Sequence, residues 1–153
     1  MTINDIMTKP PVTCRAGDPL ATAARLMWEN DCGSIPVTND GGNVVGMITD
    51  RDICMCAFMQ GKCLDAIPVS QAMAKHVYSC RPSDSLEAAE RLMREKQIRR
   101  VPVVDGDNRP IGVLSLNDIA RAAATRDTTS GDHQVTHTLA AIGQPRDHAG
   151  TAH

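Results

Sequence analysis

The order of apolar and polar positions predicts two similar groups of elements. In the first group, apolar residues at helical spacing predict a helix with one buried face: Leu20, Ala23, Ala24 and Met27. Two short apolar runs follow, "IPVT" (35–38) and "VVGMI" (44–48), and the turn-forming sequence "NDGGN" separates them. A second helix is expected from about Thr49 to Met59. The extended segment Val12–Thr13 precedes this group, so the predicted order is β-α-β-β-α.

The second group repeats this order. Its first helix carries Leu86, Ala89 and Met93 on one face, and its strands are "VPVV" (101–104) and "PIGVL" (110–114). Its last helix is expected from about Ser115 to Ala124. Asp18, followed by Pro19, and Asp84, followed by Glu87, are expected to cap the first helix of each group. The strand prolines Pro36, Pro102 and Pro110 are expected to keep the strands short or at sheet edges.

An internal duplication explains the similarity. A shift of 66 residues aligns Met7–Ala57 with Met73–Ala123 without a gap, and 17 of the 51 pairs are identical. Chance would give about three or four at typical residue frequencies. We therefore expect an α/β (α+β) protein of two repeats, residues 1–60 and 72–126. Residues 61–71 would form a linker, and 127–153 a polar tail in which Val135, Leu139 and Ile142 could mark one short docked helix, with about the last eight residues frayed.

The repeated phrases "GMITDRD" (46–52) and "GVLSLND" (112–118) have two interpretations. Each contains [ST]-x-x-D, a capping box whose hydroxyl and carboxylate bind backbone amides at a helix start. A capping box does not need the preceding glycine, so another group is expected to approach the backbone there. The alternative is a nucleotide site, in which helix-start amides hold phosphate and the aspartate accepts ribose hydroxyls.

Composition excludes some classes of partner. The net charge is −2 and only three residues are aromatic, Trp28, Phe58 and Tyr78, so a nucleic-acid interface is not expected. No apolar run reaches the roughly 18 residues of a membrane span, and the first residues do not resemble a secretion signal. We therefore expect a cytoplasmic protein whose six cysteines are free thiols.

The ordered features of both repeats resemble the cystathionine-β-synthase (CBS) domain pair, or Bateman module. The resemblance covers roughly Thr2–Ala124 and rests on the order of five features: "DIMT", the Asp-capped helix, "[IV]PV", the DG-type turn and G-h-x-[ST]-x-x-D. It implies two repeats packed through their sheets about a pseudo-twofold axis, with two clefts for AMP, ADP, ATP, S-adenosylmethionine or NAD. It also implies a regulatory signalling module rather than an enzyme, without a cofactor, which forms a homodimer and acts on an unidentified protein.

The resemblance also implies the residues of each cleft. In one cleft Asp118 would bind the ribose, Ser115 and Asn117 the ribose or phosphate, and Val113 the adenine, with Met7 and Cys32 completing the pocket. The other would use Asp52, Thr49, Arg51 and Met47, with Met73 and Ile98 from the second repeat. Arg99 and Arg100 match positions at which the family places cations that reach phosphate. Their counterparts in the first repeat are Gly33 and Ser34, which carry no charge. The Asp118 cleft is therefore expected to be the stronger site, with Arg51 partly compensating in the other cleft. A structural interpretation stays open: the arginines would end a solvated helix, and the methionines would fill the core.

Two other functions remain open. Cys54, Cys56 and Cys63 could make the scaffold a thiol or metal sensor, although Cys54 and Cys56 diverge on a helix. Cys14 and Cys80 occupy equivalent positions and are expected to be packing residues. The third function is a structural interaction protein with empty clefts. No nucleophile with a base, paired carboxylates, P-loop or G-x-G-x-x-G is present, so no enzyme is expected.

Overall fold

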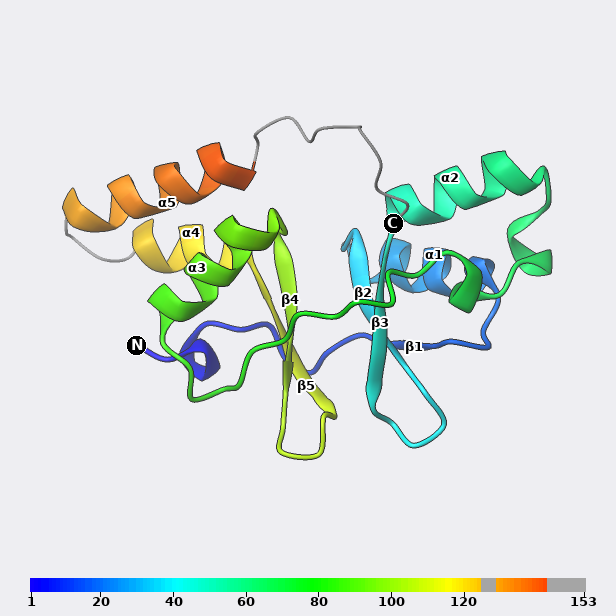
Figure 1. Ribbon diagram of the computed structural model, residues 1–153, viewed down its shortest axis with the longest axis horizontal. Helices are drawn as coiled ribbons and strands as arrows, with labels where there is room; N and C mark the ends of the chain where they lie inside the picture. Colours follow the sequence, from blue (N-terminus) through cyan, green and yellow to red (C-terminus); the bar gives the residue numbers. More distant parts are fainter. Residues whose placement is uncertain (125–128, 143–153) are drawn as a thin grey trace. The chain divides into compact units, whose positions relative to one another are not determined.

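The computed structural model describes residues 1–124 and 129–142 (Figure 1). The chain divides into two compact units that do not follow the repeats. The α1–α2 unit contains Pro10–Val77 and Val104–Ile111. The α3–α4 unit contains Met1–Lys9, Tyr78–Val103 and the described residues from Gly112 onward. Each unit therefore includes the segment that leads into the other repeat.

The α1–α2 unit contains a three-stranded sheet of order β1-β2-β3, with β1 parallel and β3 antiparallel to β2. Its elements in chain order are β1 (Cys14–Arg15), α1 (Leu20–Glu29), β2 (Ser34–Thr38), β3 (Val44–Thr49), α2 (Asp50–Gln60) and two 3-10 turns, η2 (Leu64–Ala66) and η3 (Val69–Gln71). Its core includes Leu20, Ala23 and Met27, which confirms the predicted face of α1, together with Ile35, Val37, Ile48 and Ile53.

Two details of this unit differ from the sequence expectation. β2 is the central strand, and it accommodates Pro36 because the two residues of β1 pair only with Val37 and Thr38. The range 61–71, expected to be a linker, contributes Ile67 and Val69 to the core, where both are fully buried. This segment is therefore part of the packed unit.

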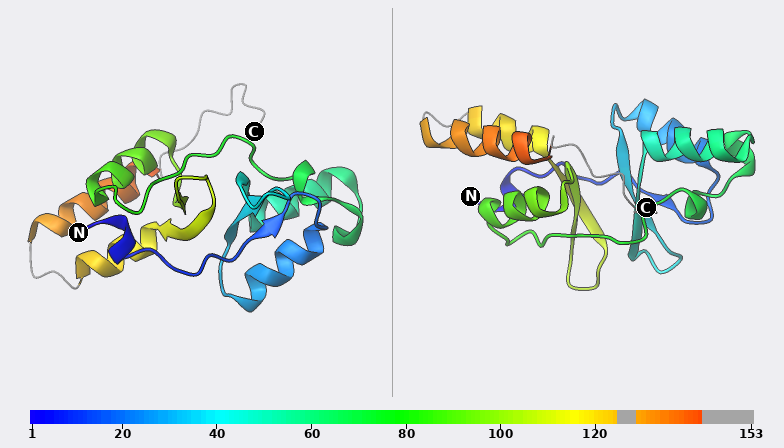
Figure 2. Two further views of the ribbon diagram at one scale, coloured as in Figure 1. Left: turned by 90° about the horizontal axis from the view of Figure 1, so that it is seen from below. Right: turned by 45° about the horizontal axis from the view of Figure 1, so that its top comes forward.

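The α3–α4 unit contains most of the paired hairpin strands β4 and β5. The strand residues next to the hairpin turn, within Val104–Ile111, belong to the α1–α2 unit. Its elements in chain order are η1 (Ile3–Asp5), α3 (Leu86–Lys96), β4 (Arg100–Val104), β5 (Pro110–Ser115), α4 (Leu116–Ala124) and α5 (Thr129–Ile142). Figures 1 and 2 show α5 beside α3 and α4, and it contacts both helices. α5 is longer than the short helix expected in the tail, and the tail beyond residue 142 lies outside the described residues.

The predicted aspartate caps are wrong for the first helix of each repeat. The N-cap of α1 is Pro19, which has no side-chain cap, and the N-cap of α3 is Ser85, whose hydroxyl accepts from Ala88 N at 3.2 Å. Asp18 and Asp84 instead accept from the amides of Arg15 and Arg81. Each aspartate therefore closes the turn before the helix, where its short side chain reaches a backbone amide three residues earlier.

Among the described residues, no helix combines the length and apolar composition needed to cross a bilayer.

A buried carboxyl group lies on the side of α3 that α5 covers. Glu90 is only 3% exposed. The residues one and two turns further along α3 both bond to α5: Arg94 Nη1 donates to Thr138 Oγ1 at 3.2 Å, and Gln97 Nε2 donates to Ala141 O at 3.4 Å. Burial raises the pKa of Glu90 above its ordinary value of 4.5, with Arg94 acting in the opposite direction and Glu87 in the same one.

Replacing Glu90 with glutamine is expected to raise the free energy of unfolding by about 1 kcal/mol at pH 8 and to leave it unchanged near pH 4. The raised pKa means that the folded protein holds the proton more tightly than the unfolded chain. The resulting stabilisation is present below pH 4.5 and is lost as the pH rises through the raised pKa of Glu90. Urea denaturation at several pH values measures this. Glu95→Gln, at an exposed site on α3, is the control, and a Glu90→Gln variant with wild-type pH dependence would contradict the expectation.

Candidate functional site

The glycine in each repeated phrase lies against the segment that leads into the other repeat. A Cβ atom on Gly46 would be 2.7 Å from Met73 Sδ and 2.9 Å from Ala74 O. Backbone hydrogen bonds hold this contact, from Met47 N to Ala74 O at 3.1 Å and from Ala74 N to Met47 O at 2.8 Å. The expected close approach is therefore made by protein, and it accounts for the glycine without a ligand.

Gly112 has the same surroundings in the α3–α4 unit. A Cβ atom there would be 2.6 Å from Met7 Sδ and 3.1 Å from Thr8 O. Thr8 N donates to Val113 O at 2.9 Å, and Val113 N donates to Thr8 O at 3.0 Å. We call residues 46–52 with 73–74 the Asp52 junction, and residues 112–118 with 7–8 the Asp118 junction. Each junction combines residues of both repeats within one unit.

The Asp52 junction contains a capping box at the start of α2. Asp52 N donates to Thr49 Oγ1 and Thr49 N donates to Asp52 Oδ2, both at 3.0 Å. The first amides of the helix are also engaged, because Asp50 N donates to Gly33 O and Arg51 N donates to the Asp50 carboxylate. The expectation that free amides would hold a phosphate is therefore not met at this helix start. Among the described residues, Asp52 Oδ1 has no hydrogen-bond donor.

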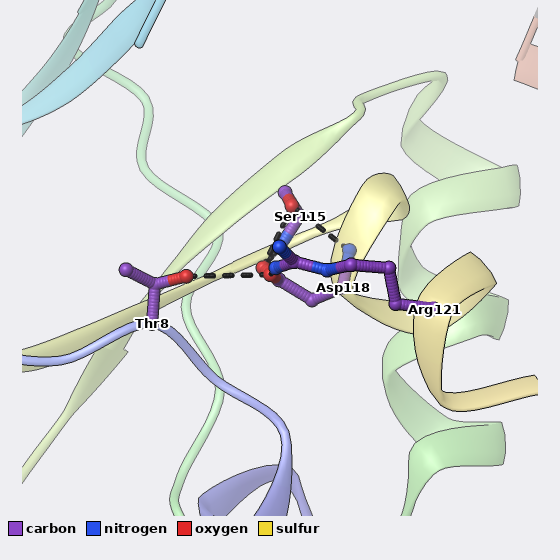
Figure 3. A network of polar contacts seen from close by, with 4 residues as sticks. All are labelled: Thr8, Ser115, Asp118 and Arg121. Carbon is purple, nitrogen blue, oxygen red and sulfur yellow. Dashed lines mark hydrogen bonds and ion pairs between the residues drawn. The ribbon is translucent and has the colours of Figure 1, made fainter. Parts of the chain in front are cut away.

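The Asp118 junction has the same capping box and two further contacts (Figure 3). Ser115 N and Ser115 Oγ donate to Asp118 Oδ2 at 2.8 and 2.6 Å, and Asp118 N donates to Ser115 Oγ at 3.1 Å. Thr8 Oγ1 donates to Asp118 Oδ1 at 3.3 Å, and Arg121 forms an ion pair with the same oxygen. Asp118 is 4% exposed, so both of its oxygens are occupied and buried.

The difference between the two aspartates can be read from the duplication. The shift of 66 residues pairs Thr8 with Ala74 and Arg121 with Met55. Neither Ala74 nor Met55 can donate a hydrogen bond to a carboxylate. Thr8 and Arg121 were not among the predicted site residues, and comparing the repeats position by position would have identified them.

Ser34 was not among the predicted site residues, although the duplication pairs it with Arg100. It pairs with Thr49 across β2 and β3, at the strand end that leads into α2. Its side chain is buried, and its hydroxyl oxygen has no hydrogen-bond partner. A buried hydroxyl without a partner is destabilising, which makes this position a candidate for contact with a bound polar group.

The structure places most of the predicted residues with the aspartate they were expected to serve. Arg99 O accepts from Leu116 N at 2.9 Å, which brings the arginine pair to the start of α4. The α3–α4 unit contains Met7, Arg99, Arg100, Val113, Ser115, Asn117 and Asp118, and the α1–α2 unit contains Met47, Thr49, Arg51, Asp52 and Met73. Cys32 belongs to the α1–α2 unit although it was expected beside Asp118, and Ile98 belongs to the α3–α4 unit although it was expected beside Asp52. Their roles as ligand contacts stay predictions.

The six cysteines are free thiols in the structure. Burial raises the pKa of Cys14 to about 12 and that of Cys80 to about 11, which makes both thiols unreactive near neutral pH. Cys54 and Cys63 are exposed. Within residues 1–124 and 129–142, no group of three or more His, Cys, Asp or Glu side chains could hold a metal ion.

Comparison with known proteins relates this arrangement to a family. The CBS domain family matches residues 3–57 and 69–125. The chain is 36% identical over 139 residues to the CBS domain-containing protein YhcV of Bacillus subtilis (strain 168), which covers 88% of this chain and 98% of that protein. The two matched segments correspond to the two copies of the duplication.

Solved structures are similar over most of the chain. The CBS domain pair of protein MJ0100, in complex with 5′-methylthioadenosine and S-adenosyl-L-methionine, has a TM-score of 0.73 and 27% identity, covering 81% of this chain and 96% of that one. CBSX2 in complex with AMP has a TM-score of 0.70 and 30% identity, covering 80% and 96%. The chain therefore belongs to the CBS domain family and contains two CBS repeats with the mixed α/β fold of CBS domain pairs.

Proposed function

We propose that this protein is a regulatory module that binds an adenosine-containing ligand first at the Asp52 junction. One observation carries the proposal: the buried hydroxyl of Ser34, the strand residue that pairs with Thr49 at the start of α2, has no partner, and Oδ1 of Asp52 in the same capping box has no donor among the described residues. The complexes of similar CBS pairs with S-adenosyl-L-methionine and with AMP support this class of ligand.

The ribose is the part of the ligand that suits Asp52. Its two adjacent hydroxyl groups are donors, and Oδ1 of this half-buried carboxylate can accept them while Oδ2 keeps its bond to Thr49 N. The cap of α2 would therefore remain intact when ribose binds, and binding would not require the helix to lose its N-terminal hydrogen bond.

A phosphate would be held by side chains rather than by helix amides, which are already bonded. The exposed guanidinium of Arg51 supplies the cation, and the hydroxyls of Thr49 and Ser34 supply donors. Met47 and Met73 are half-buried beside Gly46, where their thioethers could adapt to an adenine ring. The site would therefore recognise the nucleoside mainly, with phosphate as an additional contact.

The Asp118 junction would bind the same ligand more weakly. Ribose hydroxyls would have to displace Thr8 and Arg121 from the buried Asp118 Oδ1, whereas Asp52 Oδ1 has no donor to displace among the described residues. Arg99 and Arg100 supply two cations for phosphate at this junction and favour binding. We weigh the occupied carboxylate more heavily than the two arginines. The Asp52 junction therefore becomes the stronger site, whereas the arginines alone favoured the Asp118 junction.

Differential scanning fluorimetry with AMP, ADP, ATP, S-adenosylmethionine and NAD tests the proposal. A ligand at 100 times its Kd is expected to stabilise the protein by about 2.7 kcal/mol. Asp52→Asn should remove most of this response, because the amide presents a donor toward the ribose hydroxyls. Asp118→Asn is the matched control and should keep most of it.

Three outcomes would contradict the proposal. Loss of the response in Asp118→Asn with retention in Asp52→Asn would place the main site at the other junction. A response to zinc or to an oxidant without a response to any nucleotide would favour the sensor built on Cys54, Cys56 and Cys63. No response to any of these additions would favour a structural protein with empty clefts.

The remaining features of the proposed function follow from the regulatory role. The module would perform no chemistry of its own and would report ligand occupancy to a protein not yet identified. We place it in the cytoplasm, where its six free thiols would stay reduced. We also propose that it forms a homodimer, as the family resemblance implies.

A further inference from the structure

The carboxylate of Asp118 is saturated with hydrogen-bond donors, whereas that of Asp52 is not. An ionised carboxylate has about four acceptor positions. At Asp118 these positions receive Ser115 N, Ser115 Oγ, Thr8 Oγ1 and the guanidinium of Arg121 (Figure 3). At Asp52 a single donor is present among the described residues, the amide of Thr49. A ribose can therefore be added at Asp52, but at Asp118 it must replace a donor that is already bound.

Arg121 is the donor that can leave Asp118 most easily. Its side chain is 75% exposed, whereas that of Asp118 is buried. Ser115 belongs to the capping box of α4, and Thr8 is held beside Val113 by two backbone hydrogen bonds. Water can hydrate the guanidinium once it moves, so its departure leaves no buried donor without a partner. Arg121 is therefore the movable member of an otherwise fixed set of donors.

The departure of Arg121 would nevertheless be costly for Asp118. Within the part of the chain that the structure describes, Arg121 is the only cation that contacts this carboxylate. Burying an ionised carboxylate is unfavourable unless a cation pairs with it. Ribose hydroxyls are neutral donors, so an uncharged nucleoside cannot replace the lost positive charge. The ion pair therefore opposes the binding of nucleosides that carry no phosphate.

A phosphate group changes this balance because it gives Arg121 a new partner. Arg121 reaches back along α4 by about one turn to contact Asp118, so its guanidinium lies toward the start of the helix. A guanidinium binds phosphate through two parallel hydrogen bonds. Arg99 and Arg100 add positive charge at the same helix start, where Arg99 O accepts from Leu116 N. With a nucleotide, the cation would pass from the carboxylate to the phosphate rather than to water.

We propose that Arg121 is a specificity-determining residue that reserves the Asp118 junction for nucleotides carrying phosphate. This inference rests on the proposed function and goes beyond it, because it assigns different ligands to the two junctions. The duplication places Met55 at the corresponding position of α2, and a thioether cannot donate a hydrogen bond to Asp52. The Asp52 junction would bind adenosine as well as AMP, whereas the Asp118 junction would discriminate strongly against adenosine.

Isothermal titration calorimetry with adenosine and with AMP tests this assignment. The Asp118 junction is isolated in the Asp52→Asn variant, into which Arg121→Met introduces the side chain of the first repeat. This second substitution is expected to lower the Kd for adenosine by about tenfold, as release of a charge-assisted hydrogen bond does, and to raise the Kd for AMP. Arg91→Met is the matched control, since it removes the same charge from an exposed position on α3, and it should leave both Kd values unchanged.

The reciprocal substitution tests the same idea at the other junction. In the Asp118→Asn variant, Met55→Arg places a guanidinium one turn after Asp52, at an exposed position of α2. It is expected to raise the Kd for adenosine by about tenfold and to raise the Kd for AMP much less. This measurement decides the question even where Arg121→Met fails to fold, because it leaves the contacts of Arg121 in place.

The failures of this inference and of the proposed function can be separated. If neither adenosine nor AMP binds to wild type, the proposed function fails and the role of Arg121 fails with it. If wild type binds nucleotide but Asp52→Asn binds none, the Asp118 junction is not a site, and only the present inference is overturned. An unchanged or higher Kd for adenosine after Arg121→Met, or an unchanged one after Met55→Arg, also overturns the role of Arg121 alone.

Discussion

Replacing Gly46 with alanine is expected to lower the free energy of unfolding by about 1–3 kcal/mol, as overpacking of a dense core does. The new Cβ would lie 2.9 Å from the carbonyl oxygen of Ala74 and 2.7 Å from Met73 Sδ. The sulfur can move, but the carbonyl belongs to a backbone bridge with two hydrogen bonds to Met47. The clash can be relieved only by weakening that bridge.

Urea denaturation of three glycine variants separates this cause from a general effect of alanine. Gly112→Ala should cost less than Gly46→Ala, because its backbone neighbour, Thr8 O, would be 3.1 Å away and its closest contact is the flexible Met7 side chain. Gly106→Ala has no atom within 4 Å of its Cβ and should have almost no effect. Equal stabilities for Gly46→Ala and Gly106→Ala would show that the lead-in segment does not pack against this glycine.

Replacing Asp118 with alanine is expected to lower the free energy of unfolding by about 2–3 kcal/mol in the absence of ligand. The substitution removes the cap of α4 and leaves the amide of the half-buried Ser115 without its acceptor. It also removes the acceptor of Thr8, which connects the lead-in segment to the helix. Asp52→Ala removes only the cap of α2 and should cost about 1 kcal/mol.

The difference between the two aspartate variants is the quantity to measure. Thr8→Val removes the hydroxyl from Asp118 while keeping the shape of the side chain, and it should account for part of the difference. The pair Asp52→Ala and Asp118→Ala should be compared by denaturation at the same pH and salt concentration. Equal losses would show that the additional contacts of Asp118 contribute nothing to stability.

Most of the secondary structure could be predicted from the sequence because its signals are local. The apolar face of α1, the paired strands and the helix starts after Thr49 and Ser115 agree with the structure to within one or two residues. The expected capping boxes are present at both junctions. The caps expected from Asp18 and Asp84 were wrong because a short polar side chain before a helix can close the preceding turn equally well.

The duplication, the order of elements within each repeat and the family could be read from the sequence, since these depend on residue spacing along one segment. The three-dimensional fold was needed to show that each lead-in segment packs in the unit of the other repeat, where Met7 and Met73 approach the two glycines. It also decided that Asp118 is occupied while Ser34 lacks a partner, and that α5 covers one pair of helices. The physical reason is that hydrogen bonds and burial depend on residues far apart in the chain, and a pattern of spacing carries no information about which distant group satisfies a donor or covers a face.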